Sequence, residues 1–582
     1  MKAEGPIKLF RNCRSAFVSI GVASALISIL YLTGSFYMLE VYDRVLPSRD
    51  IPSLLAISLL AALLYGFQCA FEIVRGRVLV RIAAILDEGL ANSVFCALTV
   101  APLRMKTSGD GLQALRDFDQ VKSFLSSSGP AVLFDLPWLP IYVAVCFFFH
   151  PAIGVTAIVG AAILLLLTFL THRGSQRAIA RASEAINQRN AFAKMAQRNA
   201  EATQSMGMLS ALVSRWEHIT SEAREFNTHG ADVANRFGAI SKMLRMAIQS
   251  GVLAVGAVLV IDGKATAGII IAGSILCARA LAPVELAIGN WRNFVSARQS
   301  WARLNEFLSA HPVQSRPMIL SGPSNSLSVE GLSSGPPSVG RLVVQDVSFS
   351  IQSGSALGVI GPSGSGKSSL ARAVLGLWPS YRGVVRLDGA ALDQWDPNEL
   401  GKHIGYLPQS VELFDGTVAQ NISRFSETAS PEAIVCAAQA AGVHDLILRL
   451  PNGYGTDVGV EGVSLSAGQR QRIALARALF GDPFLVVLDE PNSNLDAEGD
   501  IALSEAIACV RRRGGIVVVI AHRPSTLENV DLVMMMGDGR VQALGPKDRV
   551  LATVLRQGRP KHSERAGALK IVGDEGSAPH GQ

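Results

Sequence analysis

The feature that most constrains the fold is a series of long uncharged runs in the first half of the chain. A helix needs about 20 predominantly apolar residues to cross a bilayer core of about 30 Å. Residues 15–39 and 51–71 contain no Asp, Glu, Lys or Arg, and residues 136–172 form a third uncharged run of 37 residues. The third run is too long for one helix and has a natural break at His150-Pro151, so it predicts a hairpin of two spans.

Two shorter uncharged runs, 246–261 and 265–278, are separated by the polar turn 262–264. Arg245 and Arg279 stand at the ends of these runs. Each could snorkel or form a structural pair, and Arg279 could instead face a polar cavity. The pattern leaves the limits of these two spans open, and the whole series predicts six spans.

The distribution of charge predicts the orientation. Lys2, Lys8, Arg11 and Arg14 precede the first span, and residues 173–245 carry 11 Lys/Arg against six acidic residues. Because positive residues favour the cytoplasmic side, both termini and both long connections, 73–134 and 173–245, are predicted to be cytoplasmic. The second connection contains no proline, which favours long helices that leave the membrane.

Composition excludes several other classes. Only 17% of residues are charged, against roughly 25% in soluble domains. The net charge of +6 is not gathered into one stripe, so it indicates membrane orientation rather than a nucleic-acid surface. Seven cysteines occur without a C-x-x-C spacing, which indicates neither a disulfide framework nor a zinc site.

A complete G-x-x-x-x-G-K-[ST] loop follows the apolar run 356–360 and precedes an apolar helical pattern. This strand–loop–helix context makes the motif specific for polyphosphate binding. Lys367 supplies charge to the outer phosphates and Ser368 a hydroxyl for Mg²⁺. The loop consists of Gly361, Pro362, Ser363, Gly364, Ser365, Gly366, Lys367, Ser368 and Ser369.

A second apolar run, 484–488, ends in the adjacent carboxylates Asp489 and Glu490. At the end of a buried strand, one carboxylate can lie near a metal ion and the other near an attacking water. We expect Asp489 to hold Mg²⁺ and Glu490 to act as the general base or to orient the water.

The segment Leu465, Ser466, Ala467, Gly468 and Gln469 precedes a helical pattern beginning at residue 470. It resembles the LSGGQ signature of the ATP-binding cassette (ABC) family, with alanine in place of one glycine. The resemblance implies that the signature of one subunit closes over the ATP held by the phosphate loop of another.

Three further motifs resemble that family in the expected order. Gln409 matches the Q-loop glutamine, which reaches Mg²⁺, and His522 matches the switch histidine at the γ-phosphate. The residues that match the D-loop are Ser493, Asn494, Leu495 and Asp496.

One family feature is absent. ABC domains carry an aromatic residue ahead of the phosphate loop, on which adenine stacks, but no Phe, Tyr or Trp occurs between Phe307 and Phe349. Stacking on a base is worth about 1–3 kcal/mol, so base recognition is weaker here or uses Arg341 or prolines. ATP is therefore implied by the resemblance and not by a visible base pocket.

The predicted fold is an all-α six-helix transmembrane domain, of the type I ABC exporter fold, fused to an α/β P-loop ATPase domain. The predicted limits are 1–14 for a cytoplasmic segment, 15–310 for the transmembrane domain, 311–324 for a linker, 325–557 for the ABC domain and 558–582 for a polar disordered tail. One loop and one signature per chain favour a homodimer, although a heterodimer stays open. Segments 106–117 and 201–208 are candidate contacts with the ATPase domain.

The substrate is suggested by two segments, 39–49 and 135–140. They resemble type I protein-secretion exporters, and most closely the PrtD-type branch of the HlyB-like family. By themselves the segments indicate only a polar turn and a Pro-kinked helix. The early first span leaves no room for an N-terminal peptidase domain, which favours export of unprocessed proteases, lipases or repeats-in-toxin proteins with a C-terminal signal.

The resemblance implies a place in the bacterial inner membrane, surrounded by lipid, and two partners: a membrane-fusion adaptor and an outer-membrane channel. A lipid or drug exporter is the alternative within transport, and wide apolar pockets in the membrane would favour it. A nucleotide-gated channel or regulator is the alternative of another class, against which Glu490 and His522 count.

Overall fold

The computed structural model describes residues 13–104, 111–311, 320–337, 340–459, 462, 464–521 and 523–557. The chain divides into two compact units, Met1–Ser315 and Arg316–Gln582. The predicted tail and most of the predicted linker lie outside the described residues, and the predicted domain limits stay predictions.

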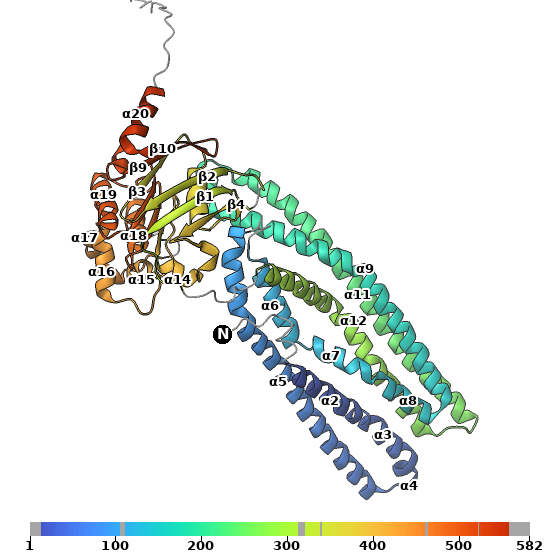
Figure 1. The fold of residues 1–582 in the computed structure, drawn as a ribbon. Helices are drawn as coiled ribbons and strands as arrows, with labels where there is room; N and C mark the ends of the chain where they lie inside the picture. The colour runs from blue at the N-terminus through green and yellow to red at the C-terminus, as the bar shows by residue number, and fades with distance from the viewer. Residues whose placement is uncertain are drawn as a thin grey trace, which may run out of the picture. The chain divides into compact units, whose positions relative to one another are not determined.

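The first unit is built from helices (Figure 1). Its elements are α2 (Arg14–Leu30), α3 (Thr33–Glu40), the π-helical η1 (Val41–Val45), α4 (Leu46–Ser48), α5 (Ile51–Arg104), α6 (Gln113–Ser126), α7 (Gly129–Asp135), the 3-10 turn η2 (Leu136–Trp138), α8 (Leu139–Phe149), α9 (Pro151–Arg198), α10 (Ala200–Ser205), α11 (Leu209–Ile261) and α12 (Ala267–Ala310).

Six of these segments are long and apolar enough to cross a membrane, as the sequence predicts. Helices α5, α9, α11 and α12 contain 54, 48, 53 and 44 residues. At about 1.5 Å per residue, each exceeds the bilayer core by a wide margin. The connection 173–245 therefore consists mainly of continuations of α9 and α11, as expected, whereas 73–134 continues α5 only to Arg104 and then contains the separate helix α6 and most of α7.

The connection after the first span differs from the predicted polar turn. Residues 41–48 continue as η1 and α4, and the chain leaves the helix only at Arg49, whose φ is 53°. Glycine is absent from 41–48, and its two charged residues, Asp43 and Arg44, are both exposed, so the segment can remain helical with its charges in solvent. The kink predicted at 135–140 is present as the 3-10 turn η2.

Polar contacts join the spans where the sequence leaves isolated charges. Arg75 donates a hydrogen bond to Asp135 at 2.6 Å. The Arg279 guanidinium lies 4.8 Å from the ring centre of Tyr31, and Arg245 forms an ion pair with Glu285. Both arginines that flank the last two spans therefore have structural partners.

The second unit contains two sheets. A four-stranded antiparallel sheet has the order β2-β1-β4-β5, with β1 (Ser326–Ser334), β2 (Val344–Gln352), β4 (Ser380–Leu387) and β5 (Ala390–Ala391). A six-stranded sheet has the order β10-β9-β3-β8-β7-β6, with β3 (Ala356–Ile360), β6 (Ile404–Leu407), β7 (Leu485–Asp489), β8 (Ile516–Ile520), β9 (Leu532–Gly537) and β10 (Arg540–Pro546).

Strands β9, β3, β8, β7 and β6 run parallel, and β7 and β8 are buried along their whole length. Because parallel strands end at the same edge, this sheet brings the residues after β3, β6 and β7 together. The remaining helices are α13 (Lys367–Val374), α14 (Pro397–Lys402), α15 (Val418–Ile422), α16 (Pro431–Ala440), α17 (His444–Leu448), α18 (Ala467–Leu479), α19 (Ala497–Arg512) and α20 (Lys547–Gln557), with short turns η3 (Leu392–Gln394), η4 (Gly453–Gly455) and η6 (Pro524–Leu527).

Candidate ATP-binding site

The phosphate loop connects β3 to α13, as its sequence predicts. Gly361 has φ 150° and a Cβ there would lie 2.2 Å from the carbonyl oxygen of Met536, so the close approach requires glycine. Gly366, with φ 96°, is the N-cap of α13 and offers no capping side chain. The N–H groups of the first turn of α13 therefore have no side-chain cap, and they can donate hydrogen bonds to an anion.

Lys367 lies inside this loop and is almost fully buried. Its Nζ donates hydrogen bonds to the carbonyl oxygens of Gly361 and Pro362 at 3.0 and 2.9 Å. Burial lowers the pKa of Lys367, and the nearby carboxylates of Glu490 and Asp489 act in the opposite direction. The ammonium is thus held at the loop, where a phosphate could replace the carbonyls as its partner.

Ser368 and Asp489 meet behind the loop. The Ser368 hydroxyl donates to Oδ1 of Asp489 at 2.9 Å, and Asp489 has no exposed surface. Burial raises the pKa of Asp489, opposed in part by this hydrogen bond. Within the described part of the chain, Asp489 Oδ2 and Ser365 Oγ are buried without a hydrogen-bond partner.

Glu490 follows at the end of β7 in a left-handed conformation, with φ 51°. Its Oε2 accepts a hydrogen bond from Nε2 of Gln409 at 3.0 Å. A non-glycine residue in this region carries strain that the surroundings must support, and here the backbone N–H of Glu490 is fixed by the carbonyl of Ile520. The sheet edge therefore unites Gln409, Asp489 and Glu490 with the phosphate loop.

The signature residues form the start of α18, which begins at Ala467 and not at residue 470 as the pattern suggested. Ser466 is its N-cap: its hydroxyl accepts from the N–H of Gln469, whose side chain accepts from the N–H of Ser466. This capping box fixes the helix start. Leu465 is buried, and a Cβ at Gly468 would lie 3.0 Å from the carbonyl oxygen of Asn494.

The sequence reading missed Gln471, which ties the signature helix to the D-loop segment. Its side chain is 2% exposed; the amide donates to the carbonyl of Pro491 and accepts from the N–H of Asn494 at 3.1 Å. The neighbouring Arg472 pairs with Asp496, which also caps α19. The hydrogen bond from Gly499 and the Arg472 charge lower the pKa of Asp496. Gln471 lies four residues after the start of α18. A glutamine at this position in a helix does not by itself indicate a functional contact.

Two predicted features are not placed beside the nucleotide loop by the structure. His522 lies outside the described residues. Among the described residues, no hydrogen bond or ion pair joins the signature segment 465–469 to the phosphate loop of the same chain, and the role of the signature stays a prediction.

An aromatic side chain that the sequence reading did not consider lies near the stretch without an adenine-stacking residue. Tyr381, in β4, is 47% exposed. Strand β4 pairs with the end of β1 through Ser334 and Ser380 and through Ser333 and Arg382. Tyr381 therefore joins Arg341 as a candidate for contact with the base.

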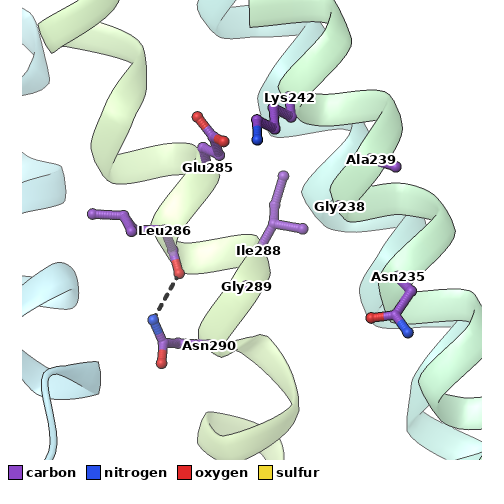
Figure 2. A pocket seen from close by; sticks show the side chains of 9 residues that line it. All are labelled: Asn235, Gly238, Ala239, Lys242, Glu285, Leu286, Ile288, Gly289 and Asn290. Atoms are coloured by element: carbon purple, nitrogen blue, oxygen red, sulfur yellow. Dashed lines mark hydrogen bonds between the residues drawn. The ribbon is translucent and has the colours of Figure 1, made fainter.

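A cavity of about 430 Å³ lies in the first unit between α11 and α12 (Figure 2). Lys242 and Glu285 stand at one end, and Asn235 and Asn290 at the other. Between them a Cβ added at Gly238 or Gly289 would meet no atom within 4 Å, so the helix backbone is open. The lining is Asn235, Gly238, Ala239, Lys242, Glu285, Leu286, Ile288, Gly289 and Asn290.

The residues present fit a nucleotide with Mg²⁺. The unpartnered carboxylate oxygen of Asp489 can bind a cation, and Mg²⁺ prefers oxygen ligands. The unpartnered hydroxyl of Ser365 can donate a hydrogen bond to a phosphate. The described residues contain no cluster of three or more His, Cys, Asp or Glu side chains that could hold a metal ion. Ser368 and Asp489, which are joined by a hydrogen bond, and Gln409 at the same sheet edge would hold Mg²⁺ together with the phosphates.

A phosphate loop on a parallel sheet, a paired Asp-Glu strand end and a signature helix define an ABC ATPase, and six spans precede it. Comparison with known families agrees. The ABC transporter model matches residues 344–493, and the model of the ABC transporter transmembrane region matches residues 17–281.

The chain is 65% identical over 569 residues to the type I secretion system ATP-binding protein PrsD of Rhizobium meliloti strain 1021, covering 98% of this chain and 97% of that protein. It is 27% identical over 552 residues to the alpha-hemolysin translocation ATP-binding protein HlyB of Escherichia coli, covering 93% and 77%. The chain therefore belongs to the ABC transporter family, in the branch of type I secretion ATP-binding proteins, and is an ATPase coupled to transport.

A solved structure of a bacterial Atm1-family ABC exporter with ATP bound has the same fold. Its TM-score is 0.82 at 21% identity, over 94% of this chain and 99% of that one. The predicted exporter architecture is confirmed by this match. The roles of individual site residues stay predictions.

Proposed function

We propose that this chain is the inner-membrane ATPase and permease of a type I secretion system, which exports an unprocessed protein from a Gram-negative cell. One observation carries the proposal: a chain with six spans also has, beside its phosphate loop, two hydrogen-bonded pairs of predicted site residues. These pairs are Ser368 with Asp489 and Gln409 with Glu490. The 65% identity to PrsD over nearly the full length of the chain favours protein secretion over lipid or drug export.

In the proposed site the loop 361–369 binds the phosphates through its N–H groups and Lys367. Mg²⁺, when bound by Ser368 and Asp489 and reached by Gln409, would neutralise phosphate charge. Glu490 accepts a proton from the attacking water, and Gln409 holds its carboxylate in place through the 3.0 Å hydrogen bond. His522 is proposed to contact the γ-phosphate.

Two copies of the chain are proposed to complete two such sites. The signature residues, Leu465, Ser466, Ala467, Gly468 and Gln469, would contact the ATP bound by the other copy. The D-loop residues, Ser493, Asn494, Leu495 and Asp496, would lie between the copies. Gln471 supports this arrangement because it fixes the D-loop to the signature helix within each copy.

For the envelope, we propose cytoplasmic termini and a cytoplasmic ATPase domain, in line with the basic N-terminal segment and connections. A membrane-fusion adaptor and an outer-membrane channel are the proposed partners. In the two segments that suggested secretion, Asp135 accepts a hydrogen bond from Arg75, and residues 41–48 extend the first span.

The cavity between α11 and α12 is our candidate contact for the exported protein. It lies beyond Arg245, on the side away from the uncharged run 246–261. Its carboxamides can bind peptide groups, and the open backbone at Gly238 and Gly289 permits close approach of a chain. A mixed polar lining suits a polypeptide better than a lipid tail.

The test is a comparison of secreted proteins between the wild type, a deletion strain, and deletion strains complemented with the wild-type gene or with Glu490→Gln. The proposal predicts that at least one protein with a C-terminal signal disappears from the medium and returns only with the wild-type gene. An unchanged set of secreted proteins together with failed lipid or drug export would support the alternative exporter instead.

A further inference from the structure

The ends of the first and sixth spans are tied together by Asp43. Its Oδ1 accepts a hydrogen bond from the backbone N–H of Gly268 at 2.9 Å, and its Oδ2 accepts from the hydroxyl of Thr266. Both donors belong to the start of α12, and they lie more than 220 residues from Asp43. The short connections between spans lie at this same end.

The backbone on both sides of the contact is shaped to let the Asp43 carboxylate reach Gly268. Asp43 lies in the π-helical turn η1, and such turns frequently occur at functional sites. Gly268 is buried, and a Cβ there would lie 2.6 Å from the Asp43 carboxyl carbon. Its hydrogen bond places the carboxylate at the N-terminus of α12, where the helix dipole favours negative charge.

This contact differs in exposure from the ion pair between the second and third spans. The side chains of Arg75 and Asp135 are 12% and 20% exposed, whereas Asp43 and Thr266 are both exposed. Water can replace the partners of an exposed group at a small net cost, but not those of a buried one. The Asp43 contact is therefore the one suited to repeated opening.

We infer that Asp43, Thr266 and Gly268 form an outer gate contact, which closes the exit side of the transmembrane domain and parts once in each transport cycle. A substrate can leave only if the outer ends of the spans separate, and this contact joins two of those ends. The inference rests on the chain being an exporter, but not on which substrate it exports.

The test links the two sides of the contact covalently. Asp43→Cys and Thr266→Cys are combined in a variant without the seven native cysteines and treated with a short, cleavable bifunctional thiol reagent. If the contact must open, the linked protein binds ATP normally and loses export, and cleavage of the linker restores export. The single-cysteine variants are the controls. Full export by the linked protein would show a static brace and overturn the inference.

A second measurement does not require a known substrate. The rate of linking is compared in the purified double-cysteine protein with and without ATP, in the Glu490→Gln background that is expected to retain ATP. A gate predicts a several-fold change in rate on ATP binding, and an unchanged rate overturns it. If the wild type secretes no protein, the proposed function fails, while this rate still decides the gate.

If the cysteine pair does not accumulate in the membrane, Thr266→Val provides another route. It removes the hydroxyl donor and leaves the Gly268 contact. A gate predicts a basal ATP hydrolysis rate above that of the wild type, because the closed state loses one of its two contacts. A rate equal to or below the wild type contradicts the gate.

Discussion

The hydroxyl of Ser368 donates a hydrogen bond to Oδ1 of Asp489 at 2.9 Å, across 121 residues of sequence. It joins the first turn of α13 to the end of β7. The second carboxylate oxygen of Asp489 is buried without a partner in the part of the chain that the structure describes. Because an unpaired buried acceptor is costly, a cation at this position would stabilise the site.

Ser368→Ala is expected to weaken the Mg²⁺ dependence of ATP hydrolysis, since it removes both a proposed ligand and the group that orients Asp489. Changes to groups that orient metal ligands lower metal affinity by about 10- to 100-fold. Hydrolysis is measured against free Mg²⁺ concentration. Ser426→Ala, an exposed serine of the same unit, is the control. An unshifted Mg²⁺ curve for Ser368→Ala would remove it from the metal site.

Glu490→Gln is expected to retain ATP binding and to lose steady-state hydrolysis. General-base catalysis contributes about 10²- to 10⁴-fold, so phosphate release should fall by that factor. The glutamine keeps the size of the side chain, and Glu505→Gln on the exposed face of α19 serves as the matched control. Turnover close to wild type would require another base.

Gln471→Leu is expected to lower both stability and hydrolysis. The change leaves the carbonyl of Pro491 and the N–H of Asn494 without their side-chain partner, and an unsatisfied buried group costs about 1–3 kcal/mol. Thermal unfolding and ATP hydrolysis of the purified protein measure the two effects. Gln439→Leu, at an exposed position of α16, should change neither thermal stability nor hydrolysis. If both variants lose the same stability and hydrolysis, Gln471 has no specific role.

Tyr381→Ala is expected to raise the KM for ATP more than Arg341→Ala does. Stacking on a base is worth about 1–3 kcal/mol, which corresponds to about one to two orders of magnitude in affinity. Steady-state kinetics on both variants compare the two candidates. The opposite ranking would assign the base to the guanidinium, and equal wild-type values would exclude both residues.

Gly238→Leu and Gly289→Leu are expected to fill the cavity between α11 and α12. Neither added side chain begins with a clash, because no atom lies within 4 Å of either Cβ position. Export should fall while basal ATP hydrolysis continues. Gly251→Leu, equally open but in the uncharged run of α11, is the control, and normal export by both cavity variants would contradict the proposed contact.

The parts of the protein that local pattern dictates could be predicted from the sequence. The uncharged runs and the six spans agree because a bilayer sets a minimum apolar length for every helix that crosses it. The phosphate loop and the strand ending in Asp489 were placed correctly on β3, α13 and β7, since each motif includes its own strand or helix.

Contacts between distant segments could not be predicted in this way. Nothing near Gln471 in the sequence shows that its amide fixes Asn494, and nothing near Tyr31 shows that Arg279 lies over its ring. The polar turn predicted at 39–49 was wrong over 41–48, because the charges there are compatible with an exposed helix and because Asp43 has its hydrogen-bond partners at the start of α12.

The length of α5 and α11 has a mechanical consequence. At about 1.5 Å per residue, helices of 54 and 53 residues measure about 80 Å, while the bilayer core occupies only about 30 Å. The uncharged run 51–71 lies at the start of α5 and the run 246–261 at the end of α11, so most of each helix extends beyond the bilayer core on one side only. A small tilt of the apolar end would therefore move the far end of the helix through a wider arc.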